Sequence, residues 1–345
     1  MSGASNADNT RRARGALLGL AVGDALGTTL EFSSPDVPPF PARLEGPHRS
    51  VTGGGPFNVR PGEVTDDTHM ACCIAGSLVT RTSFDALDVL RRYQKWRRVA
   101  FDIGLQTAAA LDFAGTDPLD GGRVVWESRK GMKPAGNGSL MRTTPIGVYF
   151  AAQEPRIEAA WKDSSLTHYD PRCLFACVAF NGAIAAGVAG APIAEMLAAA
   201  SRDLALAERR FTSTSPIASA LAEGARDVAE DLRFAEADDP RLDGPAGDGA
   251  LDILMQAGFV RVAFRLAFWE LVHAPSFEAA LVDVVNRGGD ADTNGAITGA
   301  LLGAHHGEDQ IPANWRAAVL EARGLAPPYH PSVLLEMIEA AGSHQ

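Results

Sequence analysis

The chain has few cysteines, and the four that it has form no framework for disulfides. Cys72 and Cys73 are adjacent, and Cys173 and Cys177 lie one helical turn apart, so the chain has no CxxC pair. Such spacing is typical of small buried side chains and not of a zinc cage or a disulfide-stapled fold. We therefore expect a protein of a reducing compartment, the cytoplasm.

Positive charge is also scarce. The chain has 31 basic against 42 acidic side chains and a formal net charge of −11, which argues against general affinity for nucleic acid or for an anionic membrane surface. A small phosphate-bearing ligand stays compatible with this charge, because local cations and helix N-termini bind phosphate groups.

The first apolar run of the chain does not indicate a membrane span. The run from Ala16 to Leu30 is short for a membrane span and carries Asp24, so we expect it to be a buried core helix. With 46% hydrophobic and 21% charged residues over 345 positions, the composition is that of a globular protein with a sizeable core. We expect a monomer that binds neither nucleic acid nor membranes.

Alternation of the kind that marks strands is weak, and helical periodicity dominates. We predict one all-α domain over residues 11–345, preceded by a flexible tail over residues 1–10. Ser83, Asp170 and Ser276 are the expected N-caps of three helices, and long irregular loops are expected at 33–64 and 234–249. The predicted helices span 11–28, 67–80, 84–98, 103–114, 138–151, 171–189, 192–206, 214–232, 258–273, 277–286, 292–306 and 331–341.

Glycine recurs at every fourth position in two of these segments. The stripes are Gly15, Gly19, Gly23 and Gly27 in the first segment, and Gly295, Gly299, Gly303 and Gly307 in the second. Glycine inside a helix costs about 1 kcal/mol relative to alanine, so two such stripes require a reason. A bare stripe lets helix backbones approach closer than the usual distance of about 8–10 Å. We predict that these two helices pack closely and carry acidic residues to a common point.

Acidic residues gather at four places: Glu31, the segment Thr65-Asp66-Asp67-Thr68, Asp102, and the segment Asp290-Ala291-Asp292-Thr293. Helix capping alone would explain TDDT, because aspartate and threonine suit the positive end of a helix dipole. Asp102 is equally compatible with a cap before Ile103. A calcium loop of the EF-hand type is excluded for DADTNG, because Leu301 stands at the twelfth position, where a bidentate glutamate is required.

The other interpretation of these clusters is a set of oxygen ligands for metal ions. This set contains no thiolate or clustered histidine; its members are Asp66, Asp67, Asp290, Asp292 and neighbouring threonine oxygens. Such a set suits Mg²⁺ or Mn²⁺ better than zinc. Four carboxylates match two divalent cations, which is a recurring catalytic arrangement. The motifs HExxH, GxSxG, the Walker loop and the dinucleotide fingerprint are missing from the chain.

Taken together, these motifs resemble the ADP-ribosylglycohydrolase family, and in type the bacterial dinitrogenase-reductase-activating (ADP-ribosylarginine) glycohydrolases. The resemblance covers nearly the whole chain in order: GALLGLAVGDALG with Glu31, GGGPFNVRPGEVTDDT, YQKWRRVAFDIG, GNGSLMR, THYDP and NRGGDADTNGAITGALLGAHHG. It implies a compact orthogonal helical bundle that holds two divalent cations, Mg²⁺ or Mn²⁺. The segment RKGMKPA before GNGSLMR departs from better-known relatives.

The resemblance also implies roles for particular residues. The implied catalytic residues are Glu31, beside the metals, and Asp102, near the scissile bond. The implied metal ligands are Thr65, Asp66, Asp67, Asp290, Asp292 and Thr293. The implied substrate-binding residues are Gly136, Asn137, Gly138 and Ser139 around the pyrophosphate and ribose, His168 lining the pocket, and Phe259 against the adenine.

The function implied by the resemblance is metal-dependent hydrolysis of an N-glycosidic bond, which removes ADP-ribose from arginine of modified proteins. Its partners would be an ADP-ribosylated protein and ADP-ribose. Hydrolysis of another linkage (serine-linked, polymeric or O-acetyl-ADP-ribose) is the first alternative. A non-catalytic ADP-ribose-binding protein is the second, and the presence of all six implied metal ligands argues against it.

Overall fold

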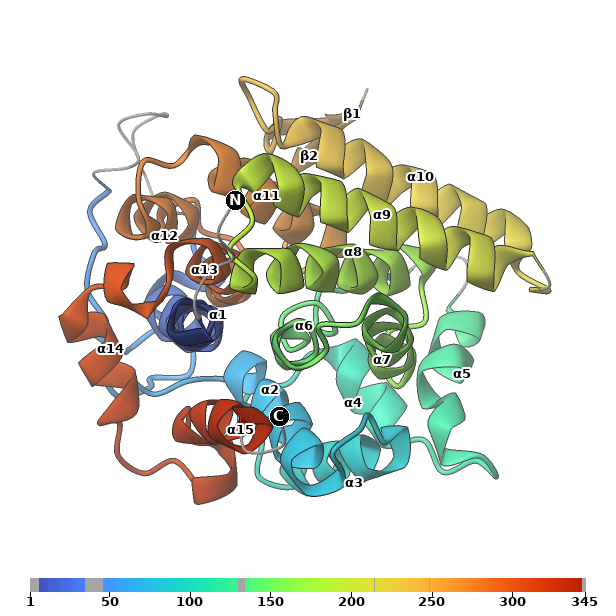
Figure 1. Ribbon diagram of the computed structural model, residues 1–345, viewed down its shortest axis with the longest axis horizontal. Helices are drawn as coiled ribbons and strands as arrows, with labels where there is room; N and C mark the ends of the chain where they lie inside the picture. Colours follow the sequence, from blue (N-terminus) through green and yellow to red (C-terminus); the bar gives the residue numbers. More distant parts are fainter. Residues whose placement is uncertain (1–5, 35–45, 130–133, 214, 248, 343–345) are drawn as a thin grey trace.

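The computed structural model describes residues 6–34, 46–129, 134–213, 215–247 and 249–342, and the regular secondary structure of these residues is almost entirely α-helical (Figure 1). The α-helices are α1 (Asn6–Gly27), α2 (Asp66–Arg81), α3 (Ala86–Trp96), α4 (Leu105–Leu111), α5 (Gly121–Ser128), α6 (Thr144–Tyr149), α7 (Gln153–Ser165), α8 (Pro171–Val188), α9 (Ile193–Thr212), α10 (Ala218–Phe234), α11 (Val260–His273), α12 (Phe277–Asn286), α13 (Ala291–His306), α14 (Ala313–Leu320) and α15 (Ser332–Gly342). Short 3₁₀ turns are η1 (Thr28–Leu30), η3 (Pro118–Asp120), η5 (Glu308–Gln310) and η6 (Pro327–Tyr329). The predicted all-α class is confirmed.

Helices α1 and α13 lie side by side in the interior, although most of the chain separates them (Figure 1). A Cβ atom built on Gly19 would stand 2.1 Å from the carbonyl oxygen of Gly299, and one built on Gly23 would stand 2.0 Å from that of Gly295. Only glycine permits this separation between two backbones, which confirms the predicted close packing. The stripes run antiparallel, because Gly15 meets Gly303 at the other end.

A second group of helices forms the rest of the core. Helices α8, α9 and α10 run beside one another in the upper layer of Figure 1, with α6 and α7 beneath α8. Helix α8 is long and apolar enough to cross a membrane, but 78% of its residues are buried inside the molecule. The buried apolar residues of α1, α2, α8, α11 and α13 belong to one continuous core, so α8 is a core helix.

The N-terminal and central boundaries differ from the predictions. Helix α1 begins at Asn6, so residues 6–10 of the predicted flexible tail are helical. The rest of that tail, residues 1–5, lies outside the described residues, as do residues 35–45 of the predicted loop 33–64. The predicted helix 138–151 shortens to α6, because residues 138–142 form turns and Pro145, in the first turn of α6, has no N–H with which to extend the helix toward them.

The helical periodicity of the sequence did not predict several elements. Helices α5, α7 and α14 were not predicted. The first two residues of α5 are glycines with weak helix propensity, and they are present because Gly121 and Gly122 pack against the backbone oxygens of Ala110 and Ser165. The strands β1 (Asp243–Gly247) and β2 (Ala250–Asp252) form an antiparallel hairpin at the end of the predicted loop 234–249.

Two of the three expected N-caps are confirmed. Asp170 accepts a hydrogen bond from the N–H of Arg172, and Ser276 accepts one from the N–H of Ala279. The prediction for Ser83 is wrong, because α3 begins later and Asp85 caps it by accepting from two backbone N–H groups.

Candidate active site

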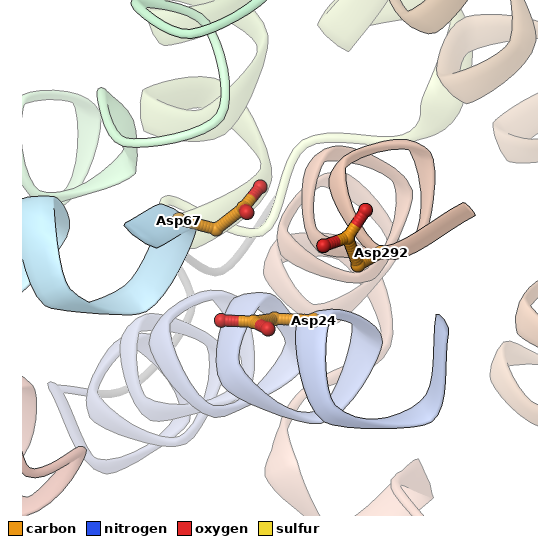
Figure 2. Close-up of side chains that lie close together, drawn as sticks. All are labelled: Asp24, Asp67 and Asp292. Carbon is orange, nitrogen blue, oxygen red and sulfur yellow. The ribbon is translucent and has the colours of Figure 1, made fainter. Parts of the chain in front are cut away.

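Three carboxylates from distant parts of the chain meet where α1, α2 and α13 come together. Asp24 lies on α1, Asp67 in the first turn of α2 and Asp292 in the first turn of α13 (Figure 2). One oxygen of each lies within 4.8 Å of the others, and all three residues are buried. The glycine pairing between α1 and α13 makes this possible, since it brings Asp24 and Asp292 to one point.

Asp24 holds the TDDT segment in place. Its carboxylate accepts hydrogen bonds from the backbone N–H of Thr65 at 3.0 Å and of Thr68 at 3.2 Å, and from the hydroxyl of Thr68 at 2.6 Å. The hydroxyl of Thr65 also lies 3.0 Å from Asp24, and 3.1 Å from Asp67 Oδ2. Thr65 is the N-cap residue of α2, yet its side chain makes no capping hydrogen bond. Capping therefore does not explain this segment.

A second acidic group adjoins the first and shares Asp292 with it. Carboxylate oxygens of Glu31, Asp102 and Asp292 lie within 4.8 Å of one another. The alternative role of Asp102 as a helix cap is not supported, because α4 begins at Leu105 behind the N-cap residue Gly104. Asp102 lies instead beside Asp66, which contacts its carboxylate through a hydrogen bond.

The mutual approach of these groups shifts their pKa values upward. Burial, followed by the nearby charges of Asp102 and Asp290, raises the pKa of Glu31 to about 9. Burial and two neighbouring aspartates raise the pKa of Asp102 to about 7. Burial and adjacent carboxylates also raise the pKa of Asp67 and of Asp292 well above the ordinary range. Without a compensating cation, the cluster must therefore retain protons.

Divalent cations suit this donor set. Among the described residues, Asp67 Oδ1 and Glu31 Oε2 are buried oxygens without a hydrogen-bond partner, and a buried oxygen without a partner is costly. The donors around them are carboxylate and hydroxyl oxygens, which are the ligands that Mg²⁺ and Mn²⁺ prefer. Cations bound in the two acidic groups would offer these oxygens partners and reduce the repulsion between the carboxylates.

The second acidic group lines a cavity of about 560 Å³, and the first group adjoins this cavity through the shared Asp292. Most of the sequence-predicted site residues line it: Glu31, Asp66, Asp102, Gly136, Asn137, Gly138, His168, Asp290, Asp292 and Thr293. Thr65 and Asp67 are completely buried beside it. The structure therefore brings together the two halves of the predicted metal centre and the predicted glycine-rich loop.

The loop 136–139 is fixed against its surroundings. Asn137 donates from Nδ2 to Asp290 Oδ2 at 2.7 Å, which ties the loop to the start of α13. A Cβ atom on Gly138 would stand 2.9 Å from the ring of His168, so glycine is needed there for the imidazole to lie against the backbone. Burial lowers the pKa of His168 well below its ordinary value, which keeps the ring neutral.

Two predicted substrate-binding residues do not line the cavity, although each is next in sequence to a residue that does. Ser139 is fully buried, and its hydroxyl accepts a hydrogen bond from the hydroxyl of Ser164 at 2.9 Å. Phe259 precedes α11, and its ring lies 5.3 Å from the guanidinium of Arg172. Neither residue is among those that line the cavity.

Asp24 is the functional residue that the sequence reasoning did not select. The sequence analysis used it only as an argument against a membrane span. A signal was nevertheless present, because Asp24 follows Gly23 directly and is the one charged side chain in the run from Ala16 to Leu30. A charge inside an otherwise apolar core helix requires partners, and here they lie 41 and 44 residues further along the chain.

Comparison with known proteins agrees with this geometry. The chain is 29% identical to "ADP-ribosylarginine hydrolase Tri1" of Pseudomonas putida, over 88% of this chain and 73% of that protein. It is 28% identical to "ADP-ribosyl-[dinitrogen reductase] glycohydrolase" of Rhodospirillum rubrum, over 88% of both chains. A solved structure described as an "ADP-ribosylglycohydrolase-related protein complex" superposes with a TM-score of 0.69 at 28% identity, covering 97% of this chain and 99% of that one.

The family model of the ADP-ribosylglycohydrolases matches residues 5–341, which includes every element described above except the last residue of α15. One family domain thus spans nearly the whole chain. It contains the paired helices α1 and α13, the two acidic groups and the glycine-rich loop. The chain belongs to the ADP-ribosylglycohydrolase family.

Proposed function

We propose that the protein is a metal-dependent hydrolase that removes ADP-ribose from arginine side chains of modified proteins. The observation that carries this proposal is the pair of acidic groups that share Asp292, one buried and the other lining the cavity. The relative that is named an ADP-ribosylarginine hydrolase supports the choice of linkage.

The residues suited to hold the cations are Thr65, Asp66, Asp67, Asp290, Asp292 and Thr293. When bound, two divalent cations would act as Lewis acids toward the ribose hydroxyls and stabilise the negative charge of the cluster. Asp24 supports this set from behind, because its oxygens already accept hydrogen bonds from Thr65 and Thr68. We assign it a positioning role.

Asp102 is suited to protonate the leaving group. It lines the cavity, and its raised pKa of about 7 allows it to carry a proton near neutral pH. In the reaction, the bond from the anomeric carbon of the ribose to the guanidine nitrogen breaks, and a bond to a water oxygen forms. The departing guanidine takes a proton from Asp102, and the water gives one to a carboxylate that bound cations would keep ionised, such as Glu31.

The rest of the cavity is suited to hold the substrate. Carboxylates stabilise the positive charge that develops on the ribose as the bond breaks. The backbone N–H groups of the loop around Gly136 and Gly138 are the groups that we expect to contact the phosphates. The neutral ring of His168, fixed at Nδ1 by Thr167 at 2.8 Å, borders this loop.

The test is release of ADP-ribose from two proteins, one modified on arginine and one on serine, with Mg²⁺, with Mn²⁺ and in excess chelator. We expect release from the arginine-linked substrate, loss of release in chelator, and loss on both substrates for Asp292→Ala. Asp309→Ala is the matched control, because Asp309 is exposed and its ion pair within the described part of the chain is with surface Arg11. Undiminished release in chelator would refute the metal mechanism, and faster release from serine would refute the linkage.

A further inference from the structure

Arg142 is a fully buried arginine directly behind the glycine-rich loop 136–139. It follows the loop by three residues, and it is not among the residues that line the cavity. Its guanidinium forms an ion pair with Asp163 on α7, in which Nε donates to Oδ2 at 3.1 Å, and Nη2 donates to the backbone carbonyl of Asp163 at 2.9 Å. A buried charge requires such partners. Neither residue has a part in the reaction proposed above.

Tyr93 on α3 holds the same ion pair from the other side. Its hydroxyl donates to Asp163 Oδ1 at 2.8 Å, and the centre of its ring lies 4.6 Å from the guanidinium carbon of Arg142. Tyr93 and Asp163 are also fully buried. The guanidinium is therefore fixed by two helices, through charge-assisted hydrogen bonds and through an aromatic face.

The third nitrogen of the guanidinium contacts the loop itself. Nη1 of Arg142 donates to the carbonyl oxygen of Gly138 at 3.3 Å. Gly138 lines the cavity, so this contact determines which polar group of its backbone can face a ligand there. A carbonyl oxygen carries partial negative charge and would repel a phosphate. This oxygen is instead bonded to the buried guanidinium behind the loop.

The free N–H groups of the loop lie at the same place. Gly136 and Asn137 already donate their backbone N–H groups, at 3.3 Å and 2.9 Å, to oxygens of neighbouring residues. The N–H groups of Gly138 and Ser139 donate no hydrogen bond within the part of the chain that the structure describes. Successive backbone N–H groups without partners suit an anion, and this pair adjoins the carbonyl that Arg142 holds.

We propose that Arg142 is a positioning residue for the glycine-rich loop. It holds the carbonyl of Gly138 away from the cavity, so that the N–H groups of Gly138 and Ser139 stay free for the phosphates of the ligand. Asp163 and Tyr93 act through Arg142, because they fix its guanidinium. This inference rests on the proposed function, and it adds a buried ion pair that touches no substrate atom yet sets the affinity for the phosphates.

The experiment replaces the ion pair as a whole, because loss of Arg142 alone would leave the buried carboxylate of Asp163 unpaired. The double variant Arg142→Met/Asp163→Asn removes both charges and the contact with Gly138. The matched control is Arg156→Met/Asp203→Asn. Arg156 and Asp203 form a similarly buried ion pair at 2.9 Å, Nη1 of this arginine also donates to two backbone carbonyls, and neither residue lines the cavity.

Calorimetric titration with ADP-ribose and with Mn²⁺ measures these variants. We expect the double variant at Arg142 to bind ADP-ribose about tenfold more weakly than wild type, as for the loss of a hydrogen bond to a charged group, with Mn²⁺ affinity within about twofold. On the arginine-linked protein substrate, KM should rise with kcat nearly unchanged, because the phosphates are bound alike in the ground state and the transition state. The control should bind ADP-ribose as wild type does.

Wild-type affinity for ADP-ribose in the double variant, or an equal loss in the control, would overturn the inference. If the double variant does not fold, Tyr93→Phe decides, since it keeps both charges and the ring and removes only the hydroxyl bonded to Asp163. This variant should also bind ADP-ribose more weakly with unchanged Mn²⁺ affinity, and unchanged ADP-ribose affinity would overturn the inference.

If the wild-type protein binds no ADP-ribose, the proposed function fails separately. Titration with inorganic phosphate, followed by the ¹H–¹⁵N signals of Gly138 and Ser139, then decides the inference. We expect both signals to shift in wild type and in the Arg156→Met/Asp203→Asn control, and to stay in place in the double variant at Arg142. Signals that do not respond to phosphate in wild type would overturn the inference.

Discussion

Substitution of Gly19 by alanine tests the pairing on which the site depends. A Cβ atom at this position would stand 2.1 Å from the carbonyl oxygen of Gly299, whereas real Cβ contacts do not fall below 3.0 Å. The backbones of α1 and α13 would have to separate by about 1 Å. Overpacking in a core costs about 1–3 kcal/mol and sometimes more, and alanine returns about 1 kcal/mol through helix propensity. At the upper end of that range, we expect a net loss of about 2 kcal/mol or more.

The matched control is Gly76→Ala in α2. A Cβ atom there would meet only the guanidinium of Arg92, at 2.8 Å, and this flexible group can turn away. We expect the control to be neutral or stabilised by up to about 1 kcal/mol. Urea unfolding followed by circular dichroism measures both variants, and Mn²⁺ titration of folded Gly19→Ala should show weakened binding. Stability of Gly19→Ala within about 0.5 kcal/mol of wild type would refute the close-packing argument.

Two further predictions concern the acidic cluster. Asp24→Asn places an amide N–H₂ among the N–H donors of Thr65 and Thr68. We therefore expect the free energy of unfolding in urea to fall by about 1–3 kcal/mol and Mn²⁺ to bind at least tenfold more weakly. Mn²⁺ binding equal to that of wild type would contradict the positioning role. In metal-free protein, the raised pKa of Glu31, about 9 against an ordinary 4.5, means that the folded state binds protons that the unfolded chain releases. The melting temperature in chelator should therefore fall as the pH rises from 5 to 9. Saturating Mn²⁺ should weaken or reverse this trend, because cations replace the protons. A melting temperature in chelator that does not change with pH would count against the protonated cluster.

The packing of α1 against α13 was predictable because glycine at every fourth position has a helix-propensity cost that only close approach explains. The antiparallel register, with Gly15 opposite Gly303, was not, since two stripes of equal period pair in either direction. The acidic segments at TDDT and DADT were recognisable because both acids and threonines are clustered within a few residues.

The role of Asp24 depends on contacts that local sequence does not encode. Its partners Thr65 and Thr68 become neighbours only after α2 has docked on α1. Likewise, a cap and a site residue at Asp102 look the same in sequence, and the structure distinguishes them by starting α4 at Leu105. The N-cap at Asp85 in place of Ser83 follows the same principle, because neighbouring cap formers compete and tertiary packing selects one.

The acidic cluster joins groups from both halves of the sequence, since Thr65 and Asp292 are 227 residues apart. On the ribosome, α1 and α2 are made long before α13 exists to cover the glycine face of α1. Until then, that face and Asp24 cannot be buried as they are in the finished domain. Synthesis of nearly the whole domain must therefore precede formation of the site, and a nascent chain that stops before α13 exposes an apolar helix prone to aggregation.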